Sequence, residues 1–126
     1  MYLKPKYLLE ICCYSPTDVI NAEKGGAHRV ELCNGYEVGG TTPSLACIQL
    51  SKSLSKLPVY VMIRPRGGNF IYSDMEKKTM LQDATNAIQN KADGIVFGAL
   101  TLNGNIDLEF CRSMKNLCGN IPITFH

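Results

Sequence analysis

The chain has 126 residues, 45% hydrophobic and 19% charged, which is the composition of a soluble globular protein large enough for one hydrophobic core. Its formal net charge of +2 is too small to indicate a nucleic acid or an acidic membrane as partner. No segment approaches the roughly 18 uncharged apolar residues that cross a bilayer, and the N-terminal apolar run is too short for a secretion signal, so we expect a cytoplasmic protein.

Short apolar segments alternate with helical segments from the N-terminus onward. The first predicted strand is Leu8–Cys12, and a helix follows Ser15, a residue type that caps helices, with proline at the first helical position. The second predicted strand is Arg29–Cys33. The second helix is expected to start at Pro43, with Thr42 as its cap.

The same alternation continues through the rest of the chain. Val59–Arg64 is the third predicted strand, and Ser73 then opens a capping box, a serine followed three residues later by a glutamate. Gly94–Phe97 is the fourth strand, Asp107 caps the fourth helix, and Ile121–His126 is the fifth strand. Strands that alternate with helices in this way predict βαβ units on a parallel sheet.

The polar residues of the predicted strands fall on one face. Side chains alternate along a strand, so the Glu-apolar-Cys repeats at 10–12 and 31–33 place each glutamate on the same face as its cysteine. By the same parity, Arg64 and His126 end their strands on that face. The opposite faces are apolar and are expected to pack on helices; they contain Leu9 and Ile11, Val30 and Leu32, Val61 and Ile63, and Ile123 and Phe125.

This charged face favours a TIM-like (β/α) barrel over a doubly wound sheet. Helices cover both faces of a doubly wound sheet, whereas the inner face of a barrel can carry charged groups toward its mouth. A complete barrel has eight strands in about 250 residues, and five strands are predicted here. We therefore expect residues 1–126 to form a single domain, the N-terminal part of a (β/α)8 barrel, with no linker or second domain.

The sequence resembles the CutC copper homeostasis protein family from about Leu8 to His126, in the segments LEIC, EKGGAHRVELC, GGTTPS, PVYVMIRPRGGNFIYSD, ADGIVFGALTLNGNID and PITFH. The run VMIRPRGG followed by YSD, together with GIVFGAL, is specific. The resemblance implies a TIM-like barrel about twice as long as this chain, a role in copper homeostasis, and a homodimer as a candidate assembly. It also implies that the family continues with further strands beyond the last segment.

One interpretation of the barrel mouth is an enzyme that acts on a small anionic molecule, a phosphate or carboxylate. Arg64 would clamp the anion and a carboxylate or imidazole would transfer a proton, although Arg64 between Glu10 and Glu31 is equally explained as an interior ion-pair network. The candidate catalytic residues are Glu10, Glu31, Arg64 and His126, and the candidate substrate-binding residues are Asn34, Arg66, Gly67 and Gly68.

The other interpretation is a metal site. Cys12 and Cys33 hold matching positions on neighbouring strands, and two thiolates suit the soft ion Cu(I), to which Met62 could add a thioether. The alternative is that both cysteines are small apolar core residues. Because the resemblance points to copper, we take Cu(I) binding by Cys12 and Cys33 as the primary hypothesis, and the anion-binding enzyme stays open.

Overall fold

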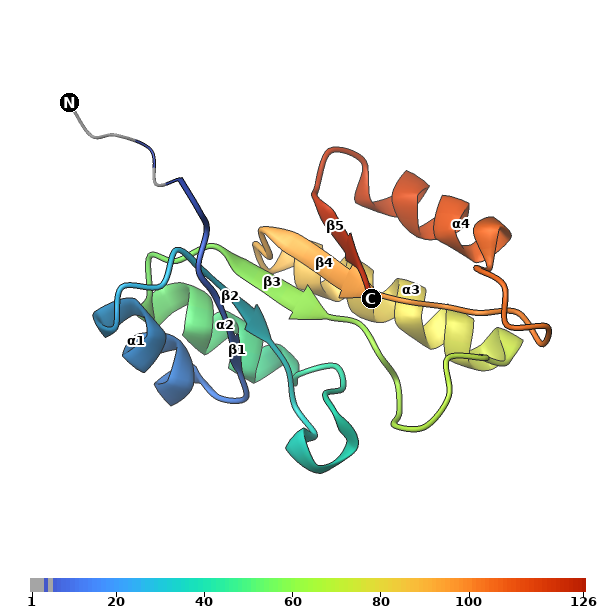
Figure 1. Ribbon diagram of the computed structural model, residues 1–126, viewed down its shortest axis with the longest axis horizontal. Coiled ribbons are helices and arrows are strands. Elements are labelled where there is room, and N and C mark those ends of the chain that lie inside the picture. The colour runs from blue at the N-terminus through green and yellow to red at the C-terminus, as the bar shows by residue number, and fades with distance from the viewer. Residues whose placement is uncertain (1–3, 5) are drawn as a thin grey trace.

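The computed structural model describes residue 4 and residues 6–126. Five parallel strands lie side by side in chain order, and helices connect them (Figure 1). The strands are β1 (Glu10–Cys13), β2 (Arg29–Leu32), β3 (Val59–Met62), β4 (Gly94–Phe97) and β5 (Ile123–Phe125). The helices are α1 (Pro16–Lys24), α2 (Leu45–Leu54), α3 (Asp74–Gln89) and α4 (Leu108–Cys118), with a short 3-10 helix η1 (Tyr36–Val38).

The strand order identifies the architecture. Each strand pairs in parallel with the next one in the sequence, from β1–β2 through β4–β5. In a doubly wound sheet the order of the strands across the sheet reverses at a switch point. Strictly sequential pairing is instead the arrangement of a (β/α) barrel. The predicted fold class is confirmed: the described chain forms five strands and four helices of a TIM-like barrel.

One face of the sheet builds the main core with the helices. Val30, Leu32, Val61 and Ile63 are fully buried there, in one cluster with residues of all four helices. The other face carries a second, small cluster of Cys33, Met62 and Val96. The sheet therefore has an outer face that packs on helices and an inner face that holds the barrel-mouth residues, as strand parity predicts.

The edge strand departs from this pattern. Leu9 and Ile11 remain 47% and 37% exposed instead of packing fully on a helix. They line an open groove of about 560 Å³ between β1 and α1, which Ala22 and Tyr36 also border. Because β1 has only one neighbouring strand among the described residues, α1 alone does not cover its outer face.

The start of α2 also differs from the sequence prediction. Ser44, not Thr42, caps the helix, because its hydroxyl accepts a hydrogen bond from the backbone N–H of Cys47. The Thr42 hydroxyl instead accepts from the backbone N–H of Arg64 at 2.9 Å, which holds Thr42 outside the helix. Within the described part of the chain, no helix is long and apolar enough to cross a membrane.

Candidate functional site

Two thiols and a carboxylate converge on the inner face of β1 and β2. Cys12 pairs with Glu31 in the strand register, and Cys33 follows two residues later on the same face as Glu31. The two sulfur atoms are 3.8 Å apart. Glu31 Oε1 lies 3.9 Å from the Cys12 sulfur and 3.6 Å from the Cys33 sulfur. The sheet thus brings three possible metal ligands within 4.8 Å of one another.

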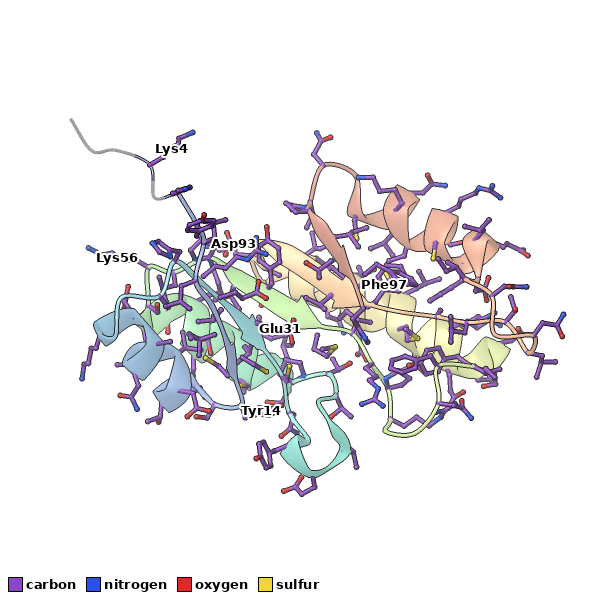
Figure 2. The ribbon with its side chains drawn as sticks, in the orientation of Figure 1. Lys4, Tyr14, Glu31, Lys56, Asp93 and Phe97 are labelled. Carbon is purple, nitrogen blue, oxygen red and sulfur yellow. The ribbon has the colours of Figure 1, made fainter. Side chains whose placement is uncertain are left out.

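The three groups differ in their access to solvent. Cys12 is exposed and Cys33 is only 1% exposed, while Glu31 is partly buried. Figure 2 shows Glu31 near the middle of the sheet, well inside the molecule's outline. The cluster therefore has an open side at Cys12 and a closed side at Cys33.

Burial shapes the charge state of these groups. Burial, with smaller contributions from Cys12 and Glu31, raises the pKa of the Cys33 thiol. Burial and the nearby charge of Glu10 raise the pKa of Glu31. The Cys33 sulfur is therefore protonated at neutral pH, and the Glu31 carboxylate that accepts hydrogen bonds from both thiols is well placed to take up their protons.

Aromatic and apolar side chains frame the cluster. Tyr14 is labelled at the carboxyl end of β1 in Figure 2, and the nearby Cys12 thiol, with burial, raises the pKa of Tyr14 to about 12. Its ring meets that of Tyr36 edge to face at 5.2 Å. Met62 belongs to the same small apolar cluster as Cys33 and therefore lies on the inner face with that thiol.

Arg64 does not lie between Glu10 and Glu31, contrary to the ion-pair network considered from the sequence. Its guanidinium donates to the backbone carbonyls of Val38 at 2.7 Å and of Gly40 and Gly68 at 2.9 Å. Glu10 forms its ion pair with Arg29 instead. The reason is the end of β3 at Met62, after which the chain turns Arg64 toward the loops.

Arg66 and the following glycines serve loop structure in this chain. Arg66 forms an ion pair with Glu76 at 2.5 Å, which holds the pKa of Glu76 below its usual range. A Cβ atom on Gly67 would lie 2.7 Å from the Cβ of Val38, so this glycine allows the two loops to pack closely. Gly68 adopts a φ of +86°, and its carbonyl binds Arg64.

Of the remaining two predicted residues, Asn34 lies beside Cys33, and His126 lies apart from the thiol pair. Asn34 is exposed, and its backbone pairs with that of Thr41 across the base of the loop. His126 follows β5, at the opposite edge of the sheet from β1, and its ring meets Phe70 edge to face at 5.3 Å. Partial burial and the positive charge of Arg64 lower the pKa of His126.

The structure adds Glu31 to the two cysteines as a possible ligand. Strand parity in the sequence placed Glu31 on the same face as Cys33, and this was the only indication that Glu31 could belong to the metal site. What it did not show is that a single carboxylate oxygen reaches both sulfurs, since that depends on the register between β1 and β2.

Comparison with known proteins identifies the family. Residues 7–126 match the CutC family. The chain belongs to the CutC family. It is 51% identical over 120 residues to the copper homeostasis protein cutC homolog of Homo sapiens, covering 95% of this chain and 44% of that protein. A CutC family protein of Bacteroides fragilis is 47% identical over 121 residues, or 95% of this chain and 48% of its own length.

A solved CutC structure agrees with the fold described above. The chain superimposes on CutC from Streptococcus agalactiae with a TM-score of 0.89 and 39% sequence identity, over 94% of this chain and 58% of that one. The chain therefore spans about half the length of the CutC proteins it matches, in keeping with five strands of a TIM-like barrel.

Proposed function

We propose that this chain binds Cu(I) through the thiolates of Cys12 and Cys33, as the metal-binding part of a copper homeostasis protein. The observation that carries the proposal is the 3.8 Å separation of the two sulfurs, with the Glu31 carboxylate beside both. The names of its relatives, copper homeostasis proteins, agree with this assignment.

The donor set fits the ion. Thiolates are soft ligands and favour Cu(I). The sulfur separation is shorter than twice a metal–thiolate bond of about 2.3 Å, as found in zinc sites, so one ion can contact both sulfurs. Ligands must lose their protons to bind metal, and Glu31 lies within reach of both thiols as a proton acceptor.

The state of the cysteines supports a reducing compartment. All six cysteines are free thiols. Thiols stay reduced in the cytosol, whereas secreted proteins oxidise theirs to disulfides, so we propose a cytoplasmic location for this copper-binding chain.

The enzyme alternative receives less support from the geometry. An anion clamp needs accessible donors, and Arg64 is buried, with three of its N–H groups on backbone carbonyls and its Nε unpartnered, while Arg66 pairs with Glu76. Proton transfer between His126 and the Glu31 cluster would have to cross from β5 to β2. We also propose that residues 1–126 form a single domain and that the protein assembles as a homodimer.

Anaerobic titration with Cu(I) in competition with a chromophoric Cu(I) chelator tests the function. Wild type is expected to withdraw one Cu(I) per chain from the chelator, and the double variant Cys12→Ser, Cys33→Ser to withdraw none. Cys12→Ser alone should weaken binding at least about tenfold, and because Cys12 is exposed this variant is expected to keep its fold.

Cys111→Ser is the matched control, since Cys111 is a partly buried thiol on α4 that lies outside the cluster. It should bind copper as wild type does. Undiminished binding by the double variant would show that the site lies elsewhere.

A further inference from the structure

Arg64 joins two loops at the barrel mouth. The first loop runs from Cys33 to Ser44 and contains η1; the second follows β3 and contains Gly67 and Gly68. Arg64 is 7% exposed, and its two terminal nitrogens make three hydrogen bonds, two to the first loop and one to the second. Hydrogen bonds from a charged donor are stronger than neutral ones, so this is a firm connection.

The backbone of Arg64 strengthens the same connection. Its carbonyl accepts from the Thr42 N–H at 2.9 Å, and its N–H donates to the Thr42 hydroxyl at 2.9 Å. Val38 also packs against Gly67, where only a glycine leaves enough room. The base of the first loop and its tip are therefore both held against the Arg64 segment.

The same loop covers one of the two proposed copper ligands. Gly40 is buried, and a Cβ at this position would lie 3.4 Å from the Cys33 sulfur and 3.9 Å from the terminal methyl of Met62. Its carbonyl is one of the three that Arg64 binds. The arginine thus fixes the residue that lies directly over the Cys33 sulfur.

We propose that Arg64 is a positioning residue that holds the loop at Val38–Gly40 closed over Cys33, so that the thiol pair is accessible only from the side of Cys12. Copper then enters at the exposed Cys12 and is retained by the covered Cys33. The statement about copper rests on the proposed function, whereas the protection of the Cys33 thiol stands on the contacts alone.

Thiol labelling of the full chain tests the protection without any metal. Wild type and Arg64→Met are treated with iodoacetamide under native conditions, and fragment mass spectrometry follows Cys33 and Cys12 separately. In wild type we expect Cys12 to label much faster than Cys33. In Arg64→Met the Cys33 rate should rise at least about tenfold, because the loop opens more often without its hydrogen bonds, and the Cys12 rate should stay within about twofold.

Arg66→Met is the matched control, because Arg66 is the neighbouring loop arginine and its carbonyl partners, Gly67, Asn69 and Ile71, all lie in its own loop. It should leave the Cys33 rate unchanged. If circular dichroism shows that Arg64→Met is unfolded, Arg64→Lys decides: it keeps the charge but loses the planar fork, and should give an intermediate Cys33 rate. An unchanged Cys33 rate in a folded Arg64 variant overturns the proposal.

Copper release separates this proposal from the proposed function. For a wild type that binds Cu(I), transfer to an excess chelator should be faster in Arg64→Met by at least about the same factor as the Cys33 labelling. Wild type that binds no Cu(I) but shows the labelling difference would refute the copper site and keep the role of Arg64. If wild type binds Cu(I) but Cys33 labels at the same rate in wild type and in Arg64→Met, the copper site stands and the role of Arg64 is refuted.

Discussion

Glu31 lies where stability and metal binding make opposite demands. Burial and the charge of Glu10 both raise the pKa of this carboxyl, so its ionised form is held in the fold at a cost. The same carboxylate is the common acceptor of the two thiols. Such conflicts between stability and local chemistry are typical of functional sites.

Glu31→Gln separates the two demands. We expect Cu(I) affinity to fall about tenfold or more, as when other supporting groups of metal sites are replaced. The free energy of unfolding at pH 7 should stay equal or rise, since a neutral amide replaces a disfavoured charge. Chelator competition and urea unfolding measure the two quantities.

Glu37→Gln provides the comparison for this substitution, because Glu37 is an exposed glutamate in the neighbouring loop. It should change neither quantity. A Glu31→Gln protein that keeps wild-type copper affinity would remove Glu31 from the site.

Helix α4 shows how one residue starts an element and ties it to its neighbour. The Asp107 carboxylate accepts from the backbone N–H of Phe110 at 3.0 Å as the helix cap. Its other oxygen accepts from Lys77 of α3 at 2.6 Å. Lys77 foremost, and then this cap bond, lower the pKa of Asp107 below its usual value.

The lowered pKa of Asp107 predicts a pH-dependent contribution to stability. A carboxyl with a depressed pKa in the folded state stabilises the fold above its unfolded pKa of about 4, and this stability is lost as pH falls through the lower folded value. Asp107→Asn keeps a capping side chain and loses the ion pair, so it should cost about 1 kcal/mol at pH 7. The difference from wild type should shrink steadily below about pH 4 in urea unfolding experiments.

Glu109→Gln controls for charge at the same helix end, since Glu109 is exposed in the first turn of α4. Its effect on unfolding should be smaller than that of Asp107→Asn at pH 7. A constant difference between Asp107→Asn and wild type from pH 7 to pH 3 would contradict the assignment of the stability to this carboxylate.

At the scale of the molecule, the described sheet has one edge at β1, which pairs there only with β2. Leu9, just before β1, and Ile11, within it, expose apolar surface beside a groove of about 560 Å³. Exposed apolar edge strands favour association with other chains. Ile11→Lys should therefore reduce concentration-dependent light scattering and the binding of an apolar dye, with helix content unchanged.

Leu102→Lys adds the same charge at an 86% exposed loop position away from the edge. It should reduce scattering less than Ile11→Lys does. Equal effects of the two substitutions would mean that net charge, and not the β1 edge, controls association.

Local chemistry in the sequence determined where three of the four helices begin. Ser15, Ser73 and Asp107 cap them as predicted, because a capping side chain binds the backbone only two or three residues away. Strand parity likewise placed Cys12 and Cys33 on one face. The regular alternation of strands and helices predicted a parallel sheet, and the charged face of its strands favoured the barrel. Each of these features depends on neighbours along the chain.

Only the tertiary structure determined which hydrogen-bond partners the polar side chains have. Arg64 reaches the carbonyls of Val38 and Gly40, 26 and 24 residues away, and the Glu31 carboxylate on β2 accepts from the Cys12 thiol on the neighbouring strand β1. Thr42 was predicted to cap α2, but its hydroxyl instead accepts a hydrogen bond from the backbone N–H of Arg64, which is also distant in the sequence. Such contacts depend on the path of loops and on strand register, which are set by packing across the molecule and leave no periodic signal in the sequence.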